Sequence, residues 1–398
     1  MTTAVLEAPA GLGARFAGVR RRTLALVEPL TPEDMMVQSC SEASPAKWHL
    51  AHTAWFFESF ILRELLPGYR LFNLDFPWLF NSYYQSFSQF PEKRLRSSFS
   101  RPGLDEILRY REHVDAAIEQ LLGLDPAPEA LERIALGLNH EEQHQELLLT
   151  DILHAFFTNP LRPAYLTGPL PEHASDSPSG SSAPEEADAE LPGALTFVPY
   201  ESGLRETGHA GAGFCFDNER QRHRVWLESH SLARRLVTCA EFATFIADGG
   251  YSRAEHWLSA GWDAVQANGW RAPLYWSREG DGKTGTWRIF TLRGEFPLDQ
   301  LAHAPVSHVS YYEADAYARW AGKRLATEFE WEAAAEAQPI AGNFLDSGRF
   351  TPARSVSASV ENDHPAQFYG DCWEWTSSAY LPYPGFHPLP GSLGEYNG

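Results

Sequence analysis

Cysteine is scarce in this sequence: 398 residues contain four, and no two of them form a C-x-x-C pair. Their wide separation excludes a disulfide framework and indicates reduced thiols. Long apolar runs are absent as well, since no stretch reaches the roughly 18 residues that a membrane-spanning helix needs. The first residues, MTTAVLEAPAGLGARF, lack the apolar core of a secretory signal. We therefore expect a soluble, cytoplasmic protein.

Positive charge is also under-represented. The chain has 32 Lys and Arg residues against 52 Asp and Glu residues, which gives a formal net charge of −20 at pH 7. A nucleic-acid partner requires clustered cations that neutralise phosphates, and an anionic membrane surface requires them too. The charge balance therefore argues against both kinds of partner and leaves small molecules as the expected ones.

What the sequence does contain is a helical N-terminal part. Apolar residues recur three and four positions apart in FAGVRRRTLALVEPL, PAKWHLAHTAWFFESFILREL, LDEILRYREHVDAAIEQLLGL and PEALERIALGLNHEEQHQELLLTDILHAFF. Ser44 followed by Pro45 predicts a helix start with Ser44 as the N-cap. Four helices with one long, aromatic-rich connection (about residues 67–102) predict a four-helix bundle over residues 1–160.

The composition changes twice after the bundle. Residues 161–192 include HASDSPSGSSAPEEADAE, which is too poor in apolar residues to bury a core and is predicted to be a linker or disordered loop. From 193 to 398, short β-like runs alternate with Gly, Asn and Trp, and TCAEFATFIADGG and SYYEADAYARWAG are typical of helices. We predict a multidomain α+β protein with an irregular second domain.

The last bundle helix carries the sequence HEEQH, and His140 and His144 lie four positions apart on one helical face. The letters match the H-E-x-x-H pattern of zinc peptidases, but the extended pattern fails because Leu147 and Thr150 replace its glycine and third histidine. Bundle interiors hold metals with side chains from facing helices, so a third ligand is expected from another helix. His49 and His52 both qualify, and the sequence does not separate them.

These motifs carry a family resemblance. LAHTAWFFE and NHEEQHQELLLTDILH are similar to the DinB-like bundle of the sulfoxide synthases of ergothioneine biosynthesis. The segments PVSHVSYYEADAYARWAGKRLATEFEWEAAA (305–335) and YGDCWEWTSSAYLPYPGF (369–386) resemble the formylglycine-generating-enzyme fold, which is C-type-lectin-like. Both halves occur in the order expected of the family. The resemblance implies that this fold serves as a borrowed, pocket-forming scaffold, because formylglycine chemistry needs a cysteine pair and only Cys372 lies near the end of the chain.

The resemblance implies a mononuclear nonheme Fe(II) held by His52, His140 and His144. It further implies that hercynine (Nα-trimethylhistidine) and a thiol bind there and that O2 drives formation of a C–S bond and a sulfoxide. Gln143 matches the position that contacts the substrate imidazole. Three protein ligands leave positions at the metal open for substrates.

For proton delivery, the adjacent Tyr83 and Tyr84 in FNSYYQ resemble the active-site tyrosines of one branch of the family. In another branch the tyrosine follows the WEWT motif, which makes Tyr380 a reserve candidate. The branch with the tyrosine pair favours free cysteine at least as much as γ-glutamylcysteine as the thiol donor. A phenol suits this role because it can give up a proton or a hydrogen atom.

A basic cluster, EKRLRSSFSRPG, follows the tyrosines within about 20 residues. Arg94, Arg96 and Arg101 are unusual in so acidic a chain, and the guanidinium fork suits a substrate carboxylate. We predict that they bind the substrate, with charge balance on the surface as the alternative interpretation. Family members usually continue beyond the position of Gly398 with an Arg-Gly-Gly-Ser segment, so we expect this chain to be shortened and the hercynine contacts of that segment to be missing from it.

Two other functions fit the same residues. A selenoneine synthase would join hercynine to a selenosugar at the same iron site, and the loop from Asn81 to Gly103 is where the sulfur and selenium donors would be discriminated. A non-catalytic metal-binding protein of the DinB type is the third hypothesis. Iron uptake and product analysis separate the three.

Overall fold

The structure is a computed structural model, and it describes residues 9–171, 194–211, 213–278, 285–354 and 364–397. Its contacts divide the chain into two units. The first unit comprises Met1–Tyr165, Gly208–Arg222 and Pro382–Gly398, and the second comprises Leu166–Thr207 and His223–Leu381. Most of the predicted linker, residues 172–193, lies outside the described residues.

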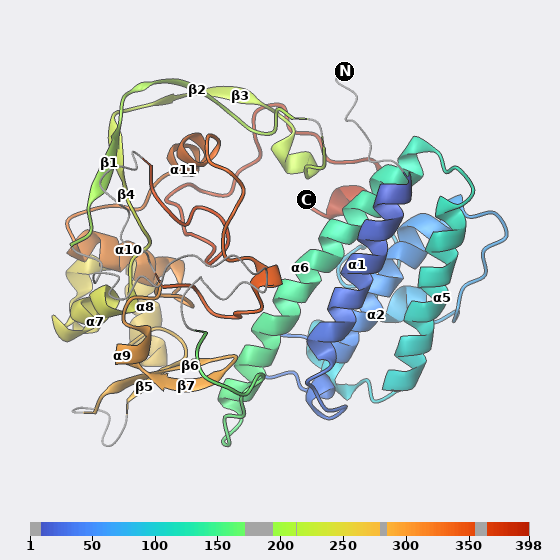
Figure 1. The fold of residues 1–398 in the computed structure, drawn as a ribbon, viewed down its shortest axis with the longest axis horizontal. Helices are drawn as coiled ribbons and strands as arrows, with labels where there is room; N and C mark the ends of the chain where they lie inside the picture. Colours follow the sequence, from blue (N-terminus) through green and yellow to red (C-terminus); the bar gives the residue numbers. More distant parts are fainter. Residues whose placement is uncertain (1–8, 172–193, 212, 279–284, 355–363, 398) are drawn as a thin grey trace, which may run out of the picture. The chain divides into compact units, whose positions relative to one another are not determined.

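Four long helices form the first unit (Figure 1): α1 (Pro9–Val27), α2 (Ala46–Phe57), α5 (Leu104–Leu122) and α6 (Pro128–Thr158). Helix α2 continues through a π-helical turn (Glu58–Leu62) into α3 (Arg63–Leu65). Helix α2 packs against α5 and α6, and α1 packs against α6. The predicted bundle is thus confirmed.

Helix α2 is the centre of the bundle. Every one of its residues is buried, including Lys47, His49 and His52. A helix that is buried on all sides has apolar residues on nearly all of its faces, and the sequence AKWHLAHTAWFF shows this pattern. Its start differs from the prediction: Pro45 occupies the N-cap position without a side-chain cap, because the Ser44 hydroxyl instead accepts a hydrogen bond from Arg96 Nη1 at 2.8 Å.

The long connection between α3 and α5 is folded along the bundle. It contains α4 (Phe76–Leu79) and a 3₁₀ helix (Lys93–Ser98), and Asn81 organises the turn between them. The Asn81 amide donates to the Tyr84 carbonyl at 3.0 Å, and its oxygen accepts from the Tyr84 N–H at 3.1 Å. Two short 3₁₀ helices, Asp217–Glu219 and Gly391–Glu395, come from the distant segments of the first unit.

A buried carboxylate joins three of the bundle helices. Glu141, which is fully buried on α6, accepts from Arg20 Nη1 at 2.8 Å, from Arg111 Nη2 at 2.9 Å and from the Thr23 hydroxyl at 2.6 Å. Arg20 also donates to Asp115 at 2.7 Å. Burial alone would raise the pKa of Glu141, but the two guanidinium groups hold it down at about 2. The network therefore contains an anion that is fully compensated.

We expect Glu141→Ala to lower the free energy of unfolding by about 3–5 kcal/mol, because Arg111 would lose its ion-pair partner inside the bundle and Arg20 would keep only Asp115. Urea unfolding of the full chain measures this. Glu142→Ala is the matched control, since the Glu142–Arg15 pair is 40% and 33% exposed and should contribute at most about 1 kcal/mol. Equal losses in the two variants would contradict the prediction.

The same carboxylate gives stability a pH dependence. The folded-state pKa of Glu141, about 2, is below its ordinary value of 4.5, so the unfolded chain binds the proton first as the pH falls. The contribution is complete above pH 4.5 and is lost between there and pH 2.

Helix α6 packs tightly against a side chain of α2 at Gly137. A Cβ added there would lie 2.6 Å from Phe57 Cε1, and the Phe57 ring is fully buried and packs edge-on against Phe16 at 5.2 Å. The ring has no room to move aside. Only glycine allows this spacing, and it brings together the two helices on which the candidate histidines lie.

Gly137→Ala should therefore destabilise the protein by about 1–3 kcal/mol through overpacking, which outweighs the gain of about 1 kcal/mol in helix propensity. The control is Gly18→Ala on α1, where nothing lies within 4 Å of the new Cβ. That variant should gain about 0.5–1 kcal/mol. Urea midpoints that move in the same direction for both variants would disprove the close-packing argument.

The second unit consists of short strands and helices around two apolar clusters. Strands β1 (Phe197–Tyr200) and β4 (His230–Ala233) pair antiparallel, as do β2 (Gly203–Thr207) and β3 (His223–Leu227). Strands β5 (Trp276–Arg278), β6 (Trp287–Thr291) and β7 (Gly294–Pro297) form a third antiparallel sheet. The helices are α7 (Cys239–Ala247), α8 (Ser259–Asn268), α9 (Leu298–Leu301), α10 (Tyr311–Trp320) and α11 (Glu328–Ala335).

Local sequence sets three of these helix starts. Thr238, Ser310 and Thr327 each cap a helix, and each has a glutamate three residues later that bonds back to the cap residue. This capping box satisfies two backbone N–H groups that the first helical turn leaves unpaired. Phe242 and Phe245 of α7 then pack with Tyr251, Trp257 and Val265 in one of the two clusters. The predicted α+β class is confirmed.

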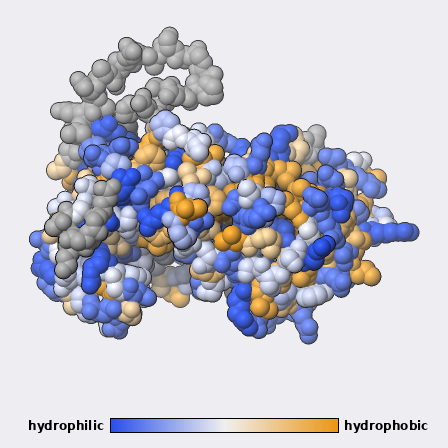
Figure 2. All heavy atoms as spheres, turned by 90° about the horizontal axis from the view of Figure 1, so that it is seen from below, coloured by the Kyte–Doolittle hydropathy of each residue, from blue (hydrophilic) through white to orange (hydrophobic). Residues whose placement is uncertain are grey.

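The surface gives no sign of a membrane-embedded segment among the described residues. On the face drawn in Figure 2, hydrophilic residues are interspersed with apolar ones. Within the described ranges, no helix combines the length and apolar character that crossing a bilayer requires.

Candidate metal centre

Three histidines from two helices meet inside the first unit. His52 lies on α2, and His140 and His144 lie on α6 (Figure 1 shows both helices). One ring nitrogen of each lies within 4.8 Å of one nitrogen of each of the others. His52 and His140 are buried and His144 is half-buried. Their spacing on α6 follows from the helical repeat, and the contact between α2 and α6 adds the third member.

The Nδ1 atoms of the three rings have different surroundings. His52 Nδ1 lies 2.7 Å from the Phe80 carbonyl, which can only accept, so Nδ1 carries the proton and Nε2 has a free lone pair. His140 Nδ1 is buried and has no hydrogen-bond partner among the described residues. His144 Nδ1 lies 2.8 Å from His49 Nδ1. The cluster therefore includes an orphaned buried nitrogen, which is a position where a ligand is expected.

His49 occupies a different place from His52. Both of its nitrogens have partners: Nδ1 faces His144, and Nε2 lies 3.0 Å from Asp151 Oδ2. The structure thus groups His52, and not His49, with the two histidines of α6.

Burial keeps the three rings neutral. It lowers the pKa of His140 to about 3, and it lowers the pKa of His52 and His144 well below the ordinary value. Mutual repulsion of the imidazoles adds to this effect at His52 and His144. A neutral imidazole has a lone pair to donate, so the rings are in the state that metal binding needs.

Aromatic rings enclose the cluster. His52 is stacked between Trp48, with ring centroids 4.4 Å apart, and Trp55, with centroids 5.1 Å apart. The Phe56 ring stacks on His140 at 4.4 Å. These buried rings fix the orientation of two candidate ligands and exclude water from one side of the site.

The predicted tyrosine pair packs against Trp55, one of the two tryptophans that stack on His52. Tyr84 is fully buried and its ring is 5.6 Å from that of Trp55. Tyr83 is 44% exposed, stacks on Tyr84 at 4.5 Å, and its hydroxyl donates to the Tyr84 hydroxyl at 3.4 Å. Burial raises the pKa of both phenols, so both are protonated at neutral pH.

A third tyrosine was not anticipated by the sequence analysis. Tyr396 lies with its ring 5.7 Å from that of His140, stacks on Phe216 at 5.5 Å, and donates a hydrogen bond to the Gln143 side-chain oxygen. Gln143 is exposed on the α6 face beside His144. Nothing in the letters EYNG distinguishes this tyrosine from a surface residue, and the reserve candidate Tyr380 belongs to the second unit and is 84% exposed.

Neighbouring residues hold this C-terminal segment on the first unit. The Glu395 carboxylate accepts from the Gln85 N–H at 2.7 Å and from the Ser86 N–H at 3.0 Å. Asn397 donates to Asp217 at 2.7 Å. The loop that contains the tyrosine pair and the segment that contains Tyr396 are therefore joined within the first unit.

The three predicted arginines have three different environments. Arg94 is 68% exposed and pairs with Glu92 at 2.6 Å. Arg96 is buried with its guanidinium 3.5 Å from the centre of the Trp48 ring, and burial lowers its pKa to about 10. Arg101 is exposed. Only Arg96 is near the histidines: it packs on the far side of the tryptophan that stacks on His52.

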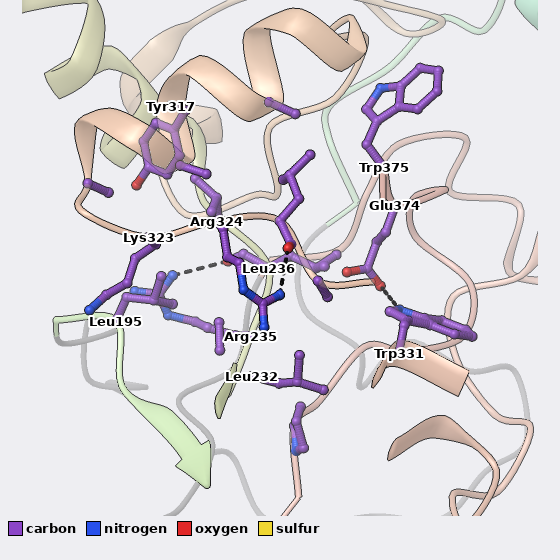
Figure 3. Close-up of a pocket in the computed structure, with 18 of the residues that line it drawn as sticks. Leu195, Leu232, Arg235, Leu236, Tyr317, Lys323, Arg324, Trp331, Glu374 and Trp375 are labelled. Carbon is purple, nitrogen blue, oxygen red and sulfur yellow. Dashed lines mark hydrogen bonds between the residues drawn. The ribbon is translucent and has the colours of Figure 1, made fainter. Parts of the chain in front are cut away.

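A separate cavity of about 780 Å³ lies in the second unit (Figure 3). Tyr317, Lys323 and Arg324 line it, as do Trp331 and Glu374. Glu374 accepts a hydrogen bond from Trp331 Nε1 at 2.9 Å, and desolvation raises its pKa to about 7. None of the predicted site residues lines this cavity, but Glu374, Trp375 and Thr376 of the WEWT motif do.

Comparison with known proteins matches both parts of the chain. Residues 15–148 match the DinB superfamily, and residues 183–365 match the sulfatase-modifying factor enzyme 1-like domain. Hercynine oxygenase from Mycolicibacterium smegmatis is 32% identical over 400 residues, covering 95% of this chain and 85% of the relative. The hercynine oxygenase of Mycolicibacterium thermoresistibile is 31% identical over 98% of this chain and 84% of its own length. Formylglycine-generating enzyme from Mycobacterium tuberculosis is 31% identical, but over only 45% of this chain.

A DinB-type bundle joined to a sulfatase-modifying-factor-like domain defines a narrow class of two-domain proteins, since relatives of the second domain alone match only about half of the chain. Similarity to the hercynine oxygenases extends over nearly the whole chain. The protein belongs to the sulfoxide synthase family of ergothioneine biosynthesis.

Proposed function

We propose that this protein is an O2-dependent nonheme Fe(II) enzyme that joins hercynine to cysteine or γ-glutamylcysteine, forming a C–S bond and a sulfoxide. The observation that carries the proposal is the convergence of His52, His140 and His144, whose nitrogens lie within 4.8 Å of one another, in a chain 32% identical to a hercynine oxygenase. The name of the relative suggests the oxygenase activity and hercynine as the substrate, and the three histidines suggest the metal site.

The donor set fits Fe(II). Imidazole nitrogen is a good ligand for Fe(II), and three protein ligands leave open positions for substrates. The rings are neutral, His52 presents Nε2 because its Nδ1 donates to Phe80, and His140 has an orphaned nitrogen. Bound iron would supply the redox chemistry, by passing to O2 the four electrons that the two substrates lose when the C–S bond forms and the sulfur is oxidised.

Side chains of the protein orient the substrate and donate a proton during the reaction. The Gln143 amide lies one residue from His144, where it can bond to an imidazole, and Tyr396 holds its oxygen through a hydrogen bond. The stacked rings of Trp48, Trp55 and Phe56 keep the ligands in place and exclude water. Tyr84 has a raised pKa, so it keeps its proton until charge develops on oxygen and then donates it.

A product assay tests the proposal. Protein loaded anaerobically with Fe(II) receives hercynine with cysteine, γ-glutamylcysteine or a selenosugar in parallel, then O2, and products are identified by mass spectrometry. We expect a hercynyl sulfoxide with one of the thiols. The matched control is the same protein loaded with Zn(II), which binds similar ligands but has no redox chemistry and should give no product.

Other outcomes would overturn the proposal in distinct ways. A selenium-containing product alone would make the protein a selenoneine synthase. One bound iron per chain with no product from any donor would support a binding role. Failure to bind iron at all would remove the three-histidine site itself.

A further inference from the structure

A chain of hydrogen bonds leads from one candidate ligand to a carboxylate on the same helix. His144 Nδ1 lies 2.8 Å from His49 Nδ1, and His49 Nε2 lies 3.0 Å from Asp151 Oδ2. The Ser44 N–H donates to the same Asp151 oxygen at 2.8 Å. His49 is buried and comes from α2, whereas His144 and Asp151 come from α6, two turns apart.

The partners fix where each proton lies. A carboxylate accepts and does not donate, so His49 Nε2 carries a proton and donates a hydrogen bond to Asp151. In a neutral His49 ring the Nδ1 atom then has a lone pair, and it must accept a hydrogen bond from His144 Nδ1–H. His144 is thereby held in the tautomer with hydrogen on Nδ1 and a lone pair on Nε2. The opposite tautomer of His49 would place the Nε2 lone pair against the Asp151 carboxylate with no proton between them.

We propose that His49 and Asp151 form a relay that selects the metal-binding tautomer of His144 and fixes the direction of its Nε2 lone pair. This inference rests on the proposed metal site. His49 and Asp151 are positioning residues, because they act on the metal only through His144. The sequence analysis gave neither residue this role, and it considered His49 only as an alternative ligand.

The relay makes the three ligands unequal. His52 donates its Nδ1–H to a neutral carbonyl, and His140 Nδ1 has no hydrogen-bond partner among the described residues. Only His144 is connected, through His49, to an anion. A carboxylate behind a ligating histidine raises the basicity of that ligand, and loss of such partners typically lowers metal affinity by about 10–100-fold. His144 should therefore be the strongest donor of the three.

The tautomer of His144 can be observed in the metal-free full-length protein. With ¹⁵N-labelled histidine, long-range ¹H–¹⁵N NMR correlations distinguish Nδ1–H from Nε2–H rings, and His144→Gln assigns the signal. We expect His144 to be the Nδ1–H tautomer in the wild type. In His49→Ala it should lose that uniform state, whereas in His49→Asn the Oδ1 atom, near the position of the lost Nδ1, should accept the proton and preserve it.

Metal affinity provides the second readout. Co(II) is titrated into each apo variant in competition with a chelator, and its visible absorption reports ligand geometry. His49→Ala should bind Co(II) about 10–100-fold more weakly. His49→Asn should recover the part of the loss that comes from the tautomer, but not the part that the link to Asp151 contributes. Asp151→Asn can still offer an oxygen to His49 and should be affected less than Asp151→Ala. The control is His154→Ala, which removes another imidazole of α6, one that is hydrogen-bonded to the Ser39 hydroxyl. This variant should match the wild type.

The outcomes separate this inference from the proposed function. Tight Co(II) binding that is unchanged in His49→Ala, or a His144 ring found as the Nε2–H tautomer in the wild type, would overturn the relay and leave the metal site intact. Equal losses in His49→Ala and His49→Asn, with circular dichroism showing both folded, would also overturn it by reducing His49 to a packing residue. Failure of the wild type itself to bind metal would overturn the proposed site instead.

Discussion

His140→Ala should abolish both iron binding and turnover. The variant removes one of the three proposed protein ligands, and it removes the ring that stacks on Phe56 and faces Tyr396. Two imidazoles hold Fe(II) far more weakly than three, and the open positions of the metal would no longer be directed at the substrates. The measurement is iron content after anaerobic loading and desalting, together with the rate of sulfoxide formation.

The control for this variant is His113→Ala. His113 is half-buried on α5, and its Nε2 atom lies 3.1 Å from the Arg70 carbonyl oxygen. The variant therefore removes a histidine from the same bundle without changing the cluster. It should keep one iron per chain and the wild-type rate. If His140→Ala retained one iron and full activity, the three-histidine site would be ruled out.

Tyr84→Phe should retain iron and lose sulfoxide formation by about 10²–10⁴-fold, the usual contribution of a positioned proton donor. Phenylalanine keeps the buried ring and its contacts with Trp55 and Phe60, so the fold should be preserved. Without the hydroxyl, oxidation of the thiol itself should compete with C–S bond formation. The ratio of hercynyl sulfoxide to oxidised thiol, measured by mass spectrometry, reports that change.

Two companion variants locate the proton donor. Tyr83→Phe removes the hydroxyl that donates to Tyr84, and Tyr396→Phe removes the one that donates to Gln143. If Tyr84 is the donor, Tyr83→Phe should have a smaller effect on the product ratio, and Tyr396→Phe should act mainly on the KM for hercynine. An unchanged product ratio in Tyr84→Phe, with a large change in Tyr396→Phe, would transfer the role to Tyr396.

Several features were predictable because they depend on short sequence separations. The four-residue spacing of His140 and His144 places them on one helical face in any α-helix. The glutamates that follow Thr238, Ser310 and Thr327 mark helix starts through local capping. The bundle, the α+β class and the family followed from periodicity and from motifs that each occupy one continuous stretch of chain.

Other features depend on which helices pack together, which local patterns do not encode. His49 and His52 are both buried on α2, and only the packing of α2 against α6 turns His52 toward the cluster and His49 toward Asp151. The same packing buries Arg96 against Trp48 while Arg94, two residues away, stays exposed.

Tyr396 shows the limit most clearly. It lies 256 residues after His140 in the sequence. It reaches the site because the C-terminal segment folds into the first unit. The sequence by itself determined the fold class, the helix that carries two of the candidate ligands and the family of the protein. The tertiary structure decided which third histidine joins the cluster, the hydrogen-bond partners of His52 and His144, and the tyrosines around the site, because contacts between distant residues are fixed by packing and not by periodicity.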